Sequence, residues 1–188
     1  MDFALFSHVP WPEGADPKQV YDDITEEFVL GEQLGFKSAW MAEHHFTRYG
    51  LGAAPNVLAG HIVANTSTLR IGSAIFVSPL HLPARLAEEI ATLDILSGGR
   101  IEVGFGRGAA SSEYNVAGVP VEESQQRFQE SITMIEGLWT TKNYSFEGKH
   151  YKITDANLVP LPIQKPHPPI HIAATRTKAT QDFVAASG

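Results

Sequence analysis

Apolar residues follow two different rhythms along this chain, and the two rhythms alternate. Short, nearly continuous apolar runs are typical of buried strands, and they occupy residues 3–7, 38–42, 69–77, 101–105 and 170–174. In longer stretches the apolar residues recur every three or four positions, which predicts helices over 17–33, 55–65, 82–96 and 122–139 and from about residue 178. Asp16 and Pro17 supply start signals for the first helix. Strands that alternate with helices predict an α/β protein with a parallel sheet.

The remaining segments predict a small insertion and a link. Residues 144–153 predict a hairpin that turns at Gly148 and Lys149, and a proline-rich link at 160–169 leads into the last strand. A chain of 188 residues can bury one sizeable core. We therefore expect a single domain over residues 1–188, with the hairpin near 144–153 as an insertion.

The glycine pattern distinguishes between two α/β architectures. A doubly wound nucleotide-binding fold would show Gly-x-Gly-x-x-Gly after its first strand, where residues 7–12 contain no glycine. Residues 104–108 are rich in glycine, but they follow the fourth strand and lack that spacing. A barrel instead builds its active site from the C-terminal ends of several strands. Polar residues follow every predicted strand here, at 7–8, 43–45, 78, 107 and 175–178, which favours a (β/α)8 TIM-barrel type.

Composition narrows the classes of function. The formal net charge of -7 argues against a nucleic-acid partner, which would need a basic face to hold phosphates. The absence of cysteine excludes disulfides and thiolate chemistry and fits a reducing cytoplasm. The sequence shows no signal-peptide pattern and no apolar run near the roughly 18–20 residues that span a bilayer. We therefore expect a cytoplasmic protein without a membrane partner.

The richest candidate chemistry lies at residues 41–46, Met-Ala-Glu-His-His-Phe, where the second strand gives way to a loop. Alternation along a strand end places Glu43 and His45 on one side and His44 on the other. An imidazole can pass protons near neutral pH, so His44 is the catalytic candidate, although a structural histidine bonded to a backbone carbonyl would fit the same pattern. We expect Glu43 and His45 to support the loop by a mutual contact. They lack a third ligand at a suitable spacing, so no metal is expected.

Two segments offer groups that could hold a phosphate. Arg107 stands between Gly106 and Gly108 at the end of the fourth strand, and an arginine there can bind phosphate bidentately or pair with a nearby carboxylate on the surface. Residues 175–178, Thr-Arg-Thr-Lys, open the last helix, where backbone N–H and hydroxyl groups favour an anion. Plain N-capping by Thr177 explains part of this pattern equally well.

Six segments have a recognisable order: Ala42-Glu-His-His-Phe46, Leu69-Arg-Ile-Gly72, Asp94-Ile-Leu-Ser-Gly-Gly-Arg100, Gly104-Phe-Gly-Arg-Gly108, the proline-rich link and Ala174-Thr-Arg-Thr177. In these segments the chain resembles the bacterial luciferase-like family of flavin-dependent monooxygenases. The resemblance implies a TIM-type barrel that uses O2 and reduced FMN, supplied by a separate flavin reductase, to oxygenate a small organic substrate. It also implies a homodimer formed by the helices at 55–65 and 82–96. A deazaflavin on the same fold is an alternative cofactor.

The resemblance also adds roles to the candidate residues. Ala74 and Ile75 end the third strand, where small and apolar groups would let a flavin ring lie against the backbone and where the family often has a cis peptide bond. Ordinary core packing explains these two residues nearly as well. The light-emitting member of the family has cysteine where Gly106 stands, so luminescence is not expected. The candidates are therefore His44 for catalysis and, for the cofactor, Glu43, Ala74, Ile75, Arg107, Thr175, Arg176 and Thr177.

Length is the main departure from the family. A (β/α)8 barrel typically needs about 250 residues, and this sequence stops after the fifth predicted βα unit. We therefore expect a barrel truncated to about its first five βα units. One hypothesis is an FMN-dependent monooxygenase. The alternative is a non-catalytic half-barrel that dimerises and binds flavin weakly or not at all, since open sheet edges leave backbone groups unpaired.

Overall fold

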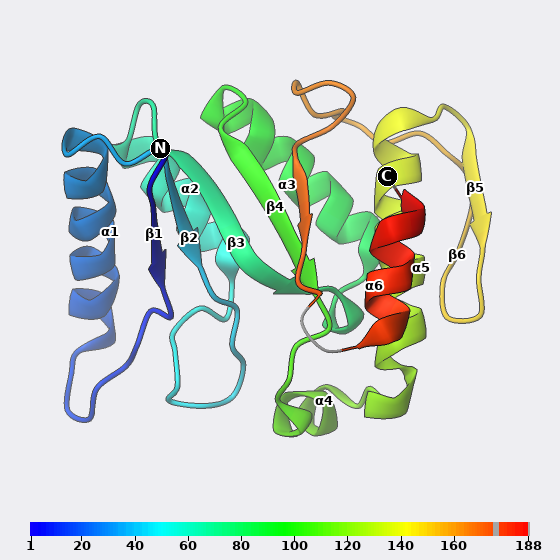
Figure 1. Ribbon diagram of the computed structural model, residues 1–188, viewed down its shortest axis with the longest axis horizontal. Helices are drawn as coiled ribbons and strands as arrows, with labels where there is room; N and C mark the ends of the chain where they lie inside the picture. Colours follow the sequence, from blue (N-terminus) through cyan, green and yellow to red (C-terminus); the bar gives the residue numbers. More distant parts are fainter. Residues whose placement is uncertain (175–176, 188) are drawn as a thin grey trace.

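A five-stranded parallel sheet forms the centre of the computed structural model, which describes residues 1–174 and 177–187 (Figure 1). The strands lie in the order β1-β2-β3-β4-β7, so each pairs with the strand that precedes or follows it in the main sheet. Their bounds are Ala4–Ser7 (β1), Ser38–Met41 (β2), Arg70–Val77 (β3), Ile101–Gly106 (β4) and Ile170–Ile172 (β7). The predicted α/β class with a parallel sheet is confirmed.

Helices connect the parallel strands, a last helix follows the final strand, and the helices pack against one another in chain order. They are α1 (Pro17–Gln33), α2 (Pro55–Asn65), α3 (Pro83–Ser97), α5 (Ser124–Thr140) and α6 (Lys178–Ser187). The start of α1 follows its sequence signals, because the Asp16 side chain accepts a hydrogen bond from the Lys18 N–H at 3.2 Å and Pro17 occupies the first turn. In Figure 1, α2 and α3 cover one face of the sheet.

The segment between β4 and α5 differs from the sequence prediction. Instead of one helix over 122–139, the chain forms α4 (Ser111–Ala117), a 3-10 turn η2 (Val121–Glu123) and then α5. Gly118 ends α4 with a φ of 69°, a left-handed conformation that glycine adopts without strain. Because α4 has only seven residues, its periodicity is too brief to stand out in the sequence. The extra helix lies beyond the carboxyl ends of the strands (Figure 1).

A hairpin outside the main sheet occupies the region where the sequence predicted one. Its strands β5 (Tyr144–Glu147) and β6 (Lys152–Ala156) pair antiparallel. Glu130 of α5 fixes the turn, since its carboxylate accepts hydrogen bonds from the backbone N–H groups of Lys149 and His150, both at 2.9 Å. A Cβ atom at Gly137 would lie 2.1 Å from the Tyr144 ring, so glycine lets the hairpin approach α5.

The apolar core lies between the sheet and the covering helices. Its largest fully buried side chains include Phe28, Met41, Ile62, Ile90 and Phe105. Among the described residues, no helix combines the length and apolar character needed to cross a membrane. Because all five strands of the main sheet run parallel, their carboxyl ends share one edge, and the loops there are held by a well-packed scaffold.

Candidate active site

A cavity of about 660 Å³ opens at the carboxyl edge of the sheet. Its volume is within the range of small-molecule sites, about 300–1,000 Å³. Every strand of the main sheet contributes to it, either directly or through the loop that follows. The lining residues are Phe6, His8, Ala42, Glu43, His44, Thr47, Tyr49, Ala74, Ile75, Val77, Gly106, Arg107, Gly108, Ala109, Ala110, Glu113, Ala173, Thr177 and Thr180.

The cavity brings together most of the residues predicted from the sequence. The catalytic candidate His44 lines it, and so do the cofactor candidates Glu43, Ala74, Ile75, Arg107 and Thr177. Thr175 and Arg176 lie outside the described residues. Four further polar positions at strand ends do not line the cavity, namely Ser7, His45, Ser78 and Lys178. Ser78 is fully buried, and Lys178 pairs with Asp182 at 2.7 Å on the surface of α6.

His44 is held by a buried carboxylate. Its Nδ1 lies 3.3 Å from Oε1 of Glu113, whose side chain is 3% exposed, and the same oxygen accepts the backbone N–H of His45 at 3.0 Å. An ionised carboxylate can only accept, so this contact requires the proton on Nδ1 and leaves Nε2 of a neutral ring as a proton acceptor. The arrangement therefore provides an oriented imidazole rather than a histidine bonded to a backbone carbonyl.

Aromatic rings surround His44 on its other sides. The ring of His8 stacks on it at 6.1 Å between centroids, and the ring of Tyr49 meets it edge-on at 4.6 Å. His8 follows β1 and Tyr49 lies in the loop after β2, so side chains from separate segments fix the position of His44. The His44 side chain keeps 23% of its surface exposed, which leaves it accessible to a ligand in the cavity.

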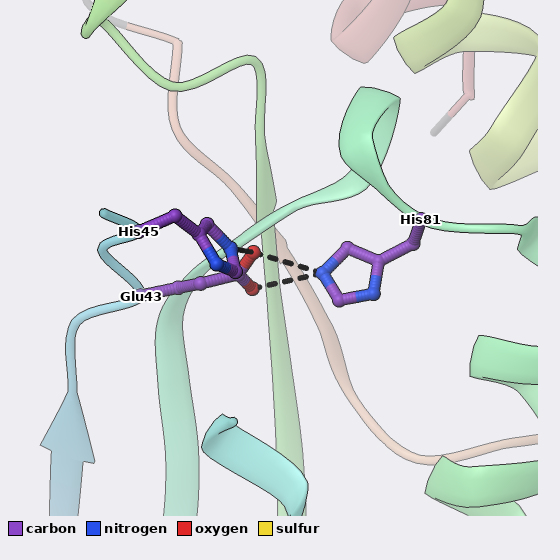
Figure 2. A group of neighbouring side chains, drawn as sticks. All are labelled: Glu43, His45 and His81. Carbon is purple, nitrogen blue, oxygen red and sulfur yellow. Dashed lines mark hydrogen bonds and ion pairs between the residues drawn. The ribbon is translucent and has the colours of Figure 1, made fainter. Parts of the chain in front are cut away.

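Glu43 and His45 share a side of the strand end, as alternation predicted, and a third residue joins them (Figure 2). Nε2 of His45 lies 2.7 Å from Oε1 of Glu43, and Nε2 of His81 lies 2.8 Å from the same oxygen. Burial alone would raise the pKa of Glu43, but the hydrogen bonds from His45 and His81 outweigh it and lower that pKa. The bond to Glu43 raises the pKa of His45, against an opposing effect of burial. The sequence predicted only the mutual contact of Glu43 and His45, and His81 joins it as a third partner.

Arg107 points its guanidinium at polar groups that carry no charge. One guanidinium nitrogen donates to the Thr177 hydroxyl at 2.7 Å, and the other lies 3.5 Å from the Ser124 hydroxyl. The backbone carbonyl of Arg107 accepts a hydrogen bond from the Tyr114 hydroxyl. Burial raises the pKa of Tyr114 to about 12, which keeps this hydroxyl protonated. Across residues 1–174 and 177–187, Arg107 forms no ion pair. The alternative of a surface arginine paired with a carboxylate is therefore not what the described residues show.

The end of β3 forms an apolar wall of the cavity. The peptide bond between Ala74 and Ile75 is cis, which confirms the expectation at this strand end, and the pairing with β4 shifts register between Ser73 and Phe76. A Cβ atom at Gly106 would lie 2.8 Å from the Ile75 side chain, so packing within the chain already explains that glycine. Gly108 has a φ of 70°, which explains the second glycine by backbone conformation.

Sequence reasoning missed Glu113 and His81. Glu113 lies on the short helix α4, and its only sequence signal is an acid close behind the glycines of 104–108. His81 follows η1 (Ser78–Leu80) and meets Glu43 across 38 positions of sequence. Contacts of that separation depend on the parallel sheet and leave no spacing pattern in the chain.

Comparisons with known proteins show the family to which the chain belongs. Residues 1–187 match the family described as luciferase-like monooxygenase. A flavin-dependent trigonelline monooxygenase, oxygenase component, from Acinetobacter baylyi is 32% identical over 191 aligned residues, covering 100% of this chain and 52% of the relative. An F420-dependent glucose-6-phosphate dehydrogenase from Amycolatopsis mediterranei is 35% identical over 159 residues, covering 81% of this chain and 47% of the relative.

A solved structure shows the same fold. The monooxygenase RslO1 from Streptomyces bottropensis superposes with a TM-score of 0.94 at 27% identity, covering 100% of this chain and 57% of that chain. The chain spans about half the length of the curated relatives that it matches.

Proposed function

The chain belongs to the luciferase-like monooxygenase family, and on that premise we propose that its cavity binds reduced FMN and, with O2, oxygenates a small organic substrate. One observation carries the proposal: a single cavity holds both the oriented imidazole of His44 and the guanidinium of Arg107. The first can move a proton and the second can hold an anion, and a flavin nucleotide needs both kinds of contact. The fold of the family is of the TIM-barrel type, and we propose that the five parallel strands correspond to the first part of such a barrel.

The lining of the cavity fits a flavin phosphate at the Arg107 side. Arg107 is half-buried and unneutralised among the described residues, with the Thr177 hydroxyl beside it. Thr177 immediately precedes α6, whose first N–H groups favour a negative charge. Ala74, Ile75 and Ala173 supply apolar surface for a flat ring system. When bound, FMN would supply the redox chemistry, which no side chain of this protein can provide.

The protein's own contribution is orientation and proton transfer. Glu113 holds the proton on Nδ1 of His44, so Nε2 can accept a proton from a reacting group and return it. The apolar part of the cavity lowers the local dielectric constant, which strengthens the contact between His44 and Glu113. Glu43 does not need to touch the cofactor in this scheme, since it is occupied by His45 and His81.

The names of the relatives support a reductase as a partner and a deazaflavin as a second candidate cofactor. The name of the Acinetobacter relative, an oxygenase component, supports a separate reductase that delivers reduced flavin to this chain as well. The F420-dependent relative supports a deazaflavin as the second candidate. The non-catalytic half-barrel is not favoured, because the residues expected at a flavin site converge on one cavity.

Titration of the 188-residue chain with FMN and with riboflavin tests the phosphate site. We expect FMN to bind more tightly than riboflavin, and Arg107→Ala to remove most of this difference, because one charge-assisted pair contributes about 1.5–3 kcal/mol. Flavin fluorescence measures both dissociation constants. An Arg48→Ala variant is the control, because the Arg48 guanidinium lies over the Trp11 ring outside the cavity lining. Equal affinities for FMN and riboflavin in the unaltered chain would contradict the phosphate site, and F420 in place of FMN tests the second cofactor.

Turnover tests the role of His44. We expect His44→Gln to bind FMN with a dissociation constant within about twofold of that of the unaltered chain. With reduced flavin supplied chemically, its turnover should be about 100-fold slower, which is the lower end of the rate loss expected when a group that transfers protons is removed. Flavin reoxidation in a stopped-flow instrument gives the rate. An unchanged rate would contradict proton transfer by His44.

A further inference from the structure

The cluster of Glu43, His45 and His81 has the composition of a metal site, although the flavin chemistry makes no use of it. The candidate ligand atoms of the three residues all lie within 4.8 Å of one another. Figure 2 shows the Glu43 carboxylate between the two imidazole rings, which approach it from different segments of the chain. Glu43 and His45 come from the loop after β2, and His81 comes from the end of η1.

We propose that Glu43, His45 and His81 form a three-ligand site for a divalent transition-metal ion of the zinc type. Two imidazole nitrogens and one carboxylate oxygen are the donor set found in sites that bind Zn²⁺ or Fe²⁺ and leave further positions for water. A site made only of carboxylates would favour Ca²⁺ or Mg²⁺ instead. The two histidines therefore decide the class of ion.

The distances require only a local adjustment. Oε1 of Glu43 lies 2.7 Å from Nε2 of His45 and 2.8 Å from Nε2 of His81. Around a tetrahedral ion with bonds of 2.0–2.1 Å, neighbouring ligand atoms lie about 3.3 Å apart. The carboxylate must therefore withdraw by about half an ångström, and the two nitrogens must converge on the ion. Both histidines lie on loop or turn segments, so they can shift without moving a strand. The other oxygen of Glu43, Oε2, accepts the backbone N–H of Val77 at the end of β3 at 3.2 Å.

The existing hydrogen bonds define the competing state. Each imidazole can donate one Nε2 proton to Glu43, which satisfies the buried carboxylate without an ion. Coordination by Nε2 requires that nitrogen to carry no proton, so a neutral ring takes up the Nδ1–H tautomer and a protonated ring releases one proton to solvent. The ion must therefore supply more binding free energy than two charge-assisted hydrogen bonds, and imidazole–zinc coordination is strong enough to do so.

An ion can reach the cluster from outside. The side chain of Glu43 is fully buried, but those of His45 and His81 are 19% and 23% exposed. His81 also lines a groove between α2 and α3 that is separate from the flavin cavity, together with Asn56, Arg85, Glu88 and Glu89. In a single copy of the chain, the groove provides an entry path and room for water at an open coordination position. A bound ion would link the loop that carries His44 to the turn after β3.

Zinc titration of the full chain, freed of metal with a chelator, tests the proposal. We expect one Zn²⁺ per chain by calorimetry and by elemental analysis after dialysis. His81→Ala and His45→Ala should each weaken Zn²⁺ binding by at least about tenfold, since each removes one of three ligands. His61→Ala, which changes an exposed histidine of α2 outside the cluster, should bind as the unaltered chain does.

The outcomes separate the metal site from the hydrogen-bonded triad. Absence of stoichiometric Zn²⁺ binding by the unaltered chain overturns the proposal, and so does affinity that survives in both His45→Ala and His81→Ala. Cobalt substitution adds a spectroscopic readout, because visible absorption typical of a nitrogen- and oxygen-ligated site must vanish in His81→Gln. Circular dichroism of each variant confirms that it is folded. Zn²⁺ binding is measured without flavin, so a failure of the metal site would not contradict the proposed flavin site, and the reverse also holds.

Discussion

At the scale of single residues, Glu113 is the group on which the candidate active site depends. Its buried carboxylate joins the ring of His44 to the backbone of His45, so one oxygen fixes both residues. Glutamine in its place could still accept the His45 N–H but would carry no charge to hold the proton on Nδ1 of His44. The fold of the loop should therefore survive while the orientation and charge of the dyad are lost.

We expect Glu113→Gln to lower kcat by about tenfold with KM and the FMN dissociation constant unchanged, as for a group that acts only on the reacting step. Steady-state turnover with a reductase and fluorescence titration measure these constants. In the His44→Gln background the same substitution should have no further effect on kcat, because the two residues act as one unit. Full additivity of the two substitutions would show that Glu113 acts independently of His44.

At the scale of elements, a carboxylate ties the end of α1 to the start of β3. Glu32 accepts hydrogen bonds from the backbone N–H groups of Ser67, Thr68 and Leu69 at 2.5–2.9 Å. Partial burial opposes ionisation, but these bonds from Thr68, Leu69 and Ser67 prevail and lower the pKa of Glu32 to about 2. The folded state therefore binds the Glu32 proton more weakly than the unfolded chain, whose glutamates titrate near 4.5.

This shift predicts a loss of stability in acid. The contribution of Glu32 to the free energy of unfolding is complete above about pH 5. It disappears as the pH falls towards 2, because protonation of Glu32 then favours the unfolded chain. We expect Glu32→Gln to lower the free energy of unfolding by about 1–2 kcal/mol at pH 7, after allowance for solvent screening, and by little near pH 2. Urea unfolding across this pH range measures the difference. Glu27→Gln, an exposed site on the same helix, is the control and should show no such pH dependence.

The segment Asp94–Arg100 shows how an element-scale motif can be structural. Asp94 is fully buried and accepts the backbone N–H groups of Ile163 and Gln164 at 2.8 and 3.0 Å, which fixes the proline-rich link on α3. Arg100 donates to the carbonyls of Val63, Thr66 and Leu69, so it satisfies backbone groups where α2 ends and β3 begins. The motif identified the family, but its residues hold the scaffold and lie outside the cavity.

Sequence patterns predicted the elements better than the contacts between them. The helix at Pro17–Gln33 and the helix at Pro55–Asn65 begin and end where the sequence placed them, because start signals and apolar periodicity are local. His44 and Arg107 were predicted as site residues because Arg107 directly follows β4 and His44 lies three positions after β2. Glu113 and His81 were not, because their partners lie 69 and 38 positions away. The strand order that joins them is a property of the sheet and not of any segment.

At the scale of the whole molecule, the surface of α2 and α3 offers a place for a second copy of the chain. Val57 of α2, Leu82 before α3 and Leu96 near its end are 75%, 70% and 70% exposed. Val57 and Leu96 also line the groove between the two helices. Exposed apolar side chains gathered in this way are typical of interaction surfaces. They support the homodimer through these helices that the family resemblance implies, which we propose for this chain.

Light scattering coupled to gel filtration tests that dimer. We expect the chain to elute with about twice its mass of 20.5 kDa, and Val57→Lys with Leu96→Lys to shift it to the monomer. A charged side chain buried at an interface centre costs a few kcal/mol, so the pair should weaken association by at least about 100-fold. Leu34→Lys is the matched control, because Leu34 is 69% exposed but follows α1, away from the groove. If the unaltered chain is monomeric at micromolar concentration, or if Leu34→Lys dissociates it equally, the α2–α3 surface is not the interface.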